Sequence, residues 1–321
     1  MKQKIYVLAV AIVLSLLACP ALRAASSGTC GARVTWTLDD AGNLVIEGSG
    51  AMDDFESNGP WGSQIKTVKI AEGVTTIGVS CFSACTELTS VSIPNTVKEI
   101  RAFAFSGCNS LEAVNIPNSV ETIGDNVFIL CKSLTSVTIP NSVTSLGTAC
   151  FYGCDNLSTV SIDMEIINGG FSDCSGLKSV IIGDSVEIIG ASAFTMCKAL
   201  TNVTLGKSVN KIGYNAFALC DSLTSFVIPN SVTCIGSGAL SWCKNLKEVT
   251  IGVSVKEIGR NLFDHCYALE KIVLLADNPP ICDEDTFEDV IKNKCVLWVR
   301  AGLVQSYKSA PVWREFANIK S

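Results

Sequence analysis

Residues 134–156 read LTSVTIPNSVTSLGTACFYGCDN, and close variants of this 23-residue segment follow one another along most of the chain. A fixed period of this length is typical of solenoids, in which each repeat forms one coil that rests on its neighbours. We therefore expect the 321 residues to form one elongated domain. The leading apolar residue recurs every 23 residues, with one step of 20, at Ile65, Leu88, Leu111, Leu134, Leu157, Leu177, Leu200, Leu223, Leu246 and Leu269.

The first half of each unit predicts a short strand. Leu134, Val137 and Ile139 are apolar and the residues between them are small and polar, as expected for a strand with one buried face. A proline or glycine ends the strand, and a V-x-x-I-G segment leads to a phenylalanine with a cysteine three residues later. Stacked in register, these halves predict a parallel sheet of about ten strands with little helix.

One unit is shorter than the others. Ile162 and Phe171 are nine positions apart, whereas Ile139 and Phe151 are twelve apart. The missing residues belong to the Pro-Asn-Ser turn, which lies on the outside of the coil. The apolar columns are therefore expected to continue through this unit.

The repeated pattern L-x-x-V-x-I-P-x-x-V-x-x-I-G-x-x-A-F-x-x-C resembles the BspA-like class of leucine-rich repeats over some 210 residues, here residues 65–276. Residues 28–55 resemble the segment that often precedes such arrays, and residues 278–316 resemble their usual terminal segment. The resemblance implies a right-handed coil. It also implies a secreted or surface-attached bacterial protein that acts in adhesion or host interaction.

Residues 1–24 have the form of a signal peptide. Lys2 and Lys4 precede an apolar run, residues 5–18, that is too short to span a membrane comfortably. Two outcomes remain open. Cleavage after Ala24 would release an exported protein, whereas lipoprotein processing at Cys19 would anchor it to a membrane.

Residues 25–64 and 277–321 are expected to cap the two ends of the array, which would otherwise expose core and strand edges. Residues 34–48 predict a β-hairpin, residues 295–299 a last strand, and residues 301–310 a short amphipathic helix with Trp313 and Phe316 packed behind it. Four of the five tryptophans lie in these caps, where we expect them to cover the ends: Trp36, Trp61, Trp298 and Trp313.

Sixteen cysteines need a physical account. Cysteine packs as a small hydrophobe, which favours a buried ladder of thiols over a ladder of disulfides, although stacked coils bring Cα atoms within disulfide range. Cys282 and Cys295 lie outside the column and form the best disulfide pair for an exported protein. Cys30 has no evident partner. Nine cysteines share one column: Cys85, Cys108, Cys131, Cys154, Cys174, Cys197, Cys220, Cys243 and Cys266.

The chain offers little catalytic or metal-binding chemistry. The single histidine, His265, precedes Cys266, but adjacent residues cannot normally aim both side chains at one substrate atom, so we interpret it as a solvated loop residue. Two acidic clusters, residues 53–56 and 283–289, do not match the spacing of a calcium loop, and the cysteine column lacks zinc-site spacing. No enzyme activity, metal or cofactor is predicted.

The net charge limits the class of partner. Without residues 1–24 the chain has 21 basic and 30 acidic residues, a net charge of −9. Such a charge disfavours nucleic acids and anionic membrane surfaces. A membrane role would therefore depend on a lipid at Cys19.

The predicted binding surface is the outward face of the strands. It carries small hydroxyl and amide side chains over most coils and turns apolar and charged near the C-terminal end. That patch departs from the repeat consensus, so specificity could be encoded there. The candidate ligand-binding residues are Ser179, Ile181, Asn202, Thr204, Ser225, Val227, Glu248, Thr250, Lys271 and Val273.

Three functions are consistent with these features. The first is an exported or cell-surface module that binds a host or neighbouring-cell protein. The second is a carbohydrate-binding module, which would need aromatic side chains on the strand face, where we find none in the repeats. The third is a purely structural surface repeat protein.

The intact mass of the protein from its native cell tests the two processing outcomes. We expect a chain that begins at Ala25 in the soluble fraction. A lipid-modified Cys19 in the membrane fraction would contradict this expectation and would identify an anchored surface array.

Overall fold

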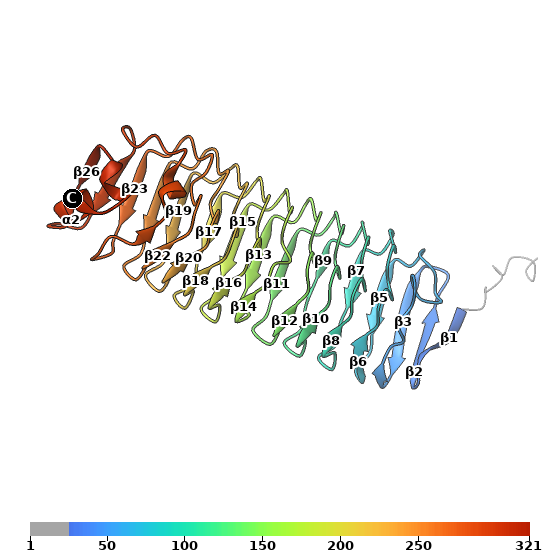
Figure 1. Cartoon of the computed structure of the whole chain (residues 1–321). Helices are drawn as coiled ribbons and strands as arrows, with labels where there is room; N and C mark the ends of the chain where they lie inside the picture. Colours follow the sequence, from blue (N-terminus) through green and yellow to red (C-terminus); the bar gives the residue numbers. More distant parts are fainter. Residues whose placement is uncertain (1–25) are drawn as a thin grey trace, which may run out of the picture.

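The computed structural model describes residues 26–321, so the predicted signal peptide and Cys19 lie outside the described residues. The chain forms an elongated β-solenoid of about twelve turns, with the N-terminal hairpin at one end and the C-terminal helix at the other (Figure 1). The predicted repeat fold is confirmed.

The strand half of every unit lies in one row of parallel strands. Val137 and Ile139 point into the core and are buried, while Ser136 and Thr138 point outward. The row forms a ten-stranded sheet from β1 to β17 and a five-stranded sheet from β19 to β26. Its repeat strands are β5 Thr67–Ile70, β7 Ser90–Ser92, β9 Ala113–Val114, β11 Ser136–Ile139, β13 Thr159–Ile162, β15 Ser179–Ile182, β17 Asn202–Thr204, β19 Ser225–Ile228, β21 Glu248–Ile251 and β23 Lys271–Leu274.

A second row of short parallel strands was not foreseen. It comes from the V-x-x-I segment and forms two sheets, which separate between β12 and β14. The break falls at the shortened unit, whose main-row strands stay paired on both sides. The strands are β6 Val74–Ile77, β8 Glu99–Ile100, β10 Thr122–Ile123, β12 Ser145–Leu146, β14 Ile166–Ile167, β16 Ile188–Ile189, β18 Lys211–Ile212, β20 Cys234–Ile235 and β22 Glu257–Ile258.

The N-terminal cap is itself an imperfect coil. The predicted hairpin is present as β2 (Val34–Leu38) and β3 (Asn43–Gly48), and β1 (Ser26–Gly31) adds an antiparallel edge strand. β3 pairs in parallel with β5, and β4 (Gly50–Ala51) joins the second row. Trp61 stacks on the first phenylalanine of the repeats, Phe82, and Trp36 packs edge-on against Trp61. These two tryptophans therefore close the core as predicted.

The C-terminal cap also continues the coil. β24 (Ile281–Cys282) extends the second row and β25 (Val296–Val299) extends the main row. Between them the 3-10 helix η1 (Glu284–Phe287) places Phe287 on Phe263. The predicted helix is α2 (Val304–Ser309), followed by η2 (Trp313–Glu315) and β26 (Asn318–Lys320). Trp313 is buried as predicted, but Trp298 is 38% exposed on β25, so its predicted role in covering the end is wrong.

The phenylalanine column forms a stack through the core. Neighbouring rings from Phe82 to Phe217 lie 4.9–5.5 Å apart between centroids. At the next coil the column holds Leu240, and Phe226 of β19 packs against Phe217 at 5.0 Å instead. In this coil the turn has leucine, which is smaller than the usual phenylalanine, and the strand has phenylalanine, which is larger than the usual valine. The two exchanges together keep the core filled.

The cysteine column is a ladder of buried thiols. From Cys108 to Cys266, each Sγ–H donates to the carbonyl of the column residue, phenylalanine or Leu240, in the preceding coil at 3.1–3.3 Å. All of these cysteines are free and buried. Most of these carbonyls also accept a backbone N–H, so the thiol is the second hydrogen-bond donor to a carbonyl inside the core. Polar groups in the core need such partners.

The predicted Cys282–Cys295 disulfide is wrong. Both residues are free thiols in the structure. Cys282 belongs to β24 in the second row, whereas Cys295 directly precedes β25 in the main row. The two cysteines therefore sit on different sheets of the coil.

Two positions in each unit adopt a left-handed backbone, two residues before and two residues after the phenylalanine. Some are glycine or asparagine, but Phe103, Leu130 and Trp242 also have φ between 58° and 62°. This conformation costs about 1–2 kcal/mol for an ordinary residue. It turns the N–H toward the next coil: Phe103 donates to Asp125 O at 3.0 Å and Leu130 to Tyr152 O at 2.8 Å. Contacts between coils thus offset local strain.

The pairing of Phe226 with Leu240 can be tested by a double-mutant cycle. Leu240→Phe alone should destabilise the protein by about 1–3 kcal/mol, because the core has no room for a second ring. Phe226→Val alone leaves a cavity and should also destabilise it. The double variant rebuilds the consensus coil and should lie closer to the wild type than the sum of the singles in urea unfolding. Strict additivity would contradict this account.

The thiol ladder predicts different costs for two buried cysteines. Cys131→Ala removes a donor to the Phe105 carbonyl and should destabilise the protein by about 1–2 kcal/mol. Cys150 stands where other coils have Ala104 or Ala193, so Cys150→Ala should be tolerated within about 1 kcal/mol. Chemical denaturation of both variants measures the difference. Equal costs would show that the thiol acts only by its volume.

Candidate interaction surface

The candidate ligand-binding residues lie together on the outward face of the main row. The buried neighbours Val180, Phe226 and Ile272 alternate with them, so their side chains point away from the core. On β15 and β17 the register pairs Ser179 with Asn202 and Ile181 with Thr204. On β19, β21 and β23, which belong to the next sheet, the register aligns the other candidates in two lines that cross the strands. The first line holds Ser225, Glu248 and Lys271, and the second holds Val227, Thr250 and Val273.

The second line ends on an aromatic side chain. Val273 of β23 pairs with Trp298 of β25, and Trp298 pairs with Lys320 of β26. Val227 is 60% exposed, Ile181 45% and Trp298 38%. The outward strand face therefore carries an aromatic residue in the C-terminal cap, beyond the repeats to which the prediction applied. Trp298 was missed because the cap continues the coil past the point where the sequence pattern fails. We call Val227, Thr250, Val273 and Trp298 the apolar line.

The charged residues of the surface are paired with each other. Lys271 Nζ lies 2.7 Å from Glu248 Oε1 on the neighbouring strand, and both side chains remain about 40% exposed. An exposed pair of this kind contributes little to stability. It does fix the two long side chains beside the apolar line.

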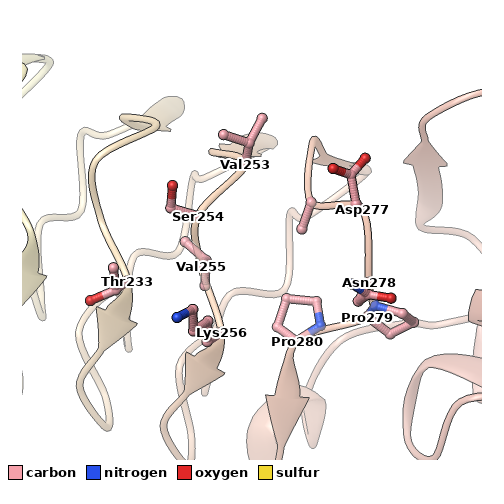
Figure 2. A pocket seen from close by; sticks show the side chains of 10 residues that line it. Thr233, Val253, Ser254, Val255, Lys256, Asp277, Asn278, Pro279 and Pro280 are labelled. Carbon is pink, nitrogen blue, oxygen red and sulfur yellow. The ribbon is translucent and has the colours of Figure 1, made fainter.

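Two hollows in the surface lie where the repeat pattern changes. One of about 440 Å³ opens between the turn at Val253–Lys256 and the segment from Asp277 to Pro280, where the prolines replace the regular turn (Figure 2). Its charged side chains are Lys256 and Asp277, and the Asp277 carboxylate is paired with Arg300. Its lining includes the hydroxyl groups of Thr233 and Ser254 but no imidazole and no thiol.

A second hollow of about 350 Å³ lies on the turn edge beside the phenylalanine column. Tyr214 and Trp242 line it together with the amides of Asn215 and Asn261. Gly238 occupies the left-handed position between those asparagines, and a Cβ there would meet Asn215 Oδ1 at 2.1 Å. The missing side chain at Gly238 therefore opens this space.

His265 is not the solvated loop residue that we predicted. Only 30% of its side chain is exposed. The imidazole stacks on the Trp242 indole at 3.6 Å between centroids, and its Nδ1 lies 2.7 Å from Asp264 Oδ1 and 3.1 Å from Asp289 Oδ2. Cys266 points the other way, donating to the Leu240 carbonyl inside the core. The two side chains diverge, as expected for adjacent residues, and form no nucleophile–base pair.

The buried thiols are poor nucleophiles. Burial raises the pKa of Cys154, Cys197 and Cys243 to about 12. A thiol with such a pKa has almost no reactive thiolate at neutral pH. Within residues 26–321 the cysteine column is thus a structural element.

One carboxylate of each predicted acidic cluster makes a structural contact. Asp54 accepts the Val79 N–H, which together with Arg101 lowers the pKa of its carboxyl. Asp283 pairs with Arg260 at 3.2 Å. In the described part of the chain, no helix is long and apolar enough to cross a membrane.

Comparison with known proteins places the repeats in a family. The model described as "BspA type Leucine rich repeat region (6 copies)" matches residues 61–170 and 164–293. No curated protein sequence matches the chain.

Several solved structures of leucine-rich repeat proteins are similar to this chain. A leucine-rich repeat protein from Eubacterium ventriosum is 23% identical, with 93% of this chain and 94% of that chain covered and a TM-score of 0.47. A leucine rich cell surface protein from Faecalibacterium prausnitzii is 23% identical, with 78% and 94% covered and a TM-score of 0.37. A leucine-rich repeat protein from Bacteroides ovatus is 21% identical, with 84% and 98% covered and a TM-score of 0.35.

Proposed function

The chain belongs to the BspA-type leucine-rich repeat family, and we propose that it is a non-enzymatic, exported protein that adheres to proteins of a host or a neighbouring cell. The observation that carries the proposal is the apolar line on the outward strand face. Its side chains stand at positions where earlier coils have Ser92, Asn115 and Thr138.

The apolar line has the properties of a protein-binding centre. Tryptophan is among the residues that contribute most to interfaces, and aliphatic neighbours exclude water around it. The Glu248–Lys271 pair lies next to the line and supplies a polar rim. All of these side chains stand on paired strands, so little order is lost when a partner binds. An extended or flat protein surface with an exposed apolar centre fits this face.

Cell binding with matched variants tests the proposal. Labelled protein comprising residues 25–321 should bind intact target cells saturably, and protease treatment of the cells should abolish the binding. Val227→Ser with Trp298→Ser should weaken binding at least tenfold, about 1.4 kcal/mol. The control is Val253→Ser with Ile291→Ser, which removes exposed apolar groups away from the strand face. Equal loss in both variants, or none in either, would contradict the proposed surface.

The hollow with Tyr214 and Trp242 favours a second candidate function, carbohydrate binding. Aromatic rings pack on the apolar faces of sugars, and the amides of Asn215 and Asn261 can bond to hydroxyl groups. Binding that resists protease, is lost after periodate oxidation of the cells and is weakened by Tyr214→Ala would identify this function.

A further inference from the structure

We propose that Asp264, His265 and Asp289 form a binding site for a divalent first-row transition ion such as Zn²⁺. Asp264 and His265 belong to the last regular coil, and Asp289 belongs to the C-terminal cap, two residues after Phe287. One ligand atom from each residue lies within 4.8 Å of the other two. The ion would join the cap to the repeats.

The spacing of the ligand atoms suits one small cation. His265 Nδ1 lies 2.7 Å from Asp264 Oδ1 and 3.1 Å from Asp289 Oδ2. An ion about 2.0–2.2 Å from each ligand requires separations of about 2.9–3.5 Å. A small adjustment of these side chains therefore satisfies the geometry, and the partly exposed side leaves room for water as a further ligand.

The charge of the cluster also favours a cation. In residues 26–321, neither carboxylate has a lysine or arginine nitrogen within 4.0 Å; the ion-pair partner of each is His265. With a neutral imidazole, two negative charges meet without compensation. The backbone N–H of His265 donates to Asp289 Oδ2 at 3.0 Å, which fixes the position of this carboxylate. A mixed set of imidazole and carboxylates prefers Zn²⁺ or Ni²⁺ to Ca²⁺.

The position of Asp289 is built by the repeat. In earlier coils the N–H two residues after the phenylalanine donates to a carbonyl of the next coil, as Trp242 does to Asp264 O at 2.6 Å. At the last regular coil the Asp289 carboxylate takes the place of that carbonyl. Trp242 holds the imidazole from the other side by stacking at an interplanar angle of 10°. Both His265 and Asp289 are thus oriented before an ion arrives, as strong sites require.

Trp242 provides a direct signal for binding. Ni²⁺ bound at His265 Nδ1 should quench the stacked indole, so titration of metal-free, full-length mature protein with Ni²⁺ should reduce tryptophan fluorescence saturably. Zn²⁺ should compete with Ni²⁺ and raise the melting temperature, whereas Ca²⁺ should do neither. Trp242→Phe should lose the quench and keep the Zn²⁺-induced rise in melting temperature.

Conservative variants distinguish metal binding at this site from metal binding by other thiols and carboxylates of the protein. His265→Asn tolerates the left-handed backbone, Asp289→Asn keeps an acceptor for the His265 N–H, and Asp264→Asn alters a side chain that caps no backbone group. Each folded variant should bind Ni²⁺ at least tenfold more weakly. Asp173→Asn, at the His265 position of an earlier coil, is the matched control and should bind normally. No saturable quench up to about 1 mM, or an unchanged midpoint in all three variants, would overturn the proposal.

Discussion

The hydrogen bonds that run from one coil to the next are the constraint on which the rest of this structure depends. A single 23-residue unit buries few side chains, while ordering its backbone costs about 1–2 kcal/mol per residue. Each coil is therefore stable only between two others. The bonds from Phe103, Phe105 and Gly107 to the following coil show how complete the stacking is, because every second N–H of the turn is used.

The same constraint explains residues that look unfavourable alone. Leu130 and Trp242 adopt left-handed backbones in which their N–H groups donate to carbonyls of the following coil. Glycines such as Gly147 are required because a Cβ would meet the backbone of the preceding coil at 2.2 Å. The cysteine column follows too, since a thiol is small enough for the core and still donates to the carbonyl behind it.

The period of the sequence was sufficient to predict the coils, their main strands and the apolar columns, because those positions repeat with the packing. It was not sufficient at the ends. Trp61 and Phe287 continue the aromatic stack from segments whose spacing no longer matches the repeat. For the same reason the outward position of Trp298 and the separation of Cys282 from Cys295 became visible only when the strand pairing was known.

Of the two candidate sites, the outward strand face could be predicted from the sequence and the cluster around His265 could not. The outward direction of Val227 and Lys271 follows from strand alternation, and the structure places them as expected. The cluster around His265 could not be found by spacing, because Asp289 lies 24 residues away and reaches it through the coil register. Residues that are neighbours in space on two adjacent coils are far apart in the sequence.

Hydrogen exchange of the backbone amides, followed by mass spectrometry on short peptides, tests most directly that stacking between coils holds the fold. The account predicts that the turn peptide containing Asn126 and Leu130, both with left-handed backbones, exchanges as slowly as the core strands. Protection from exchange should decrease toward both caps. Rapid exchange of this turn, at the rate of exposed loops, would contradict it.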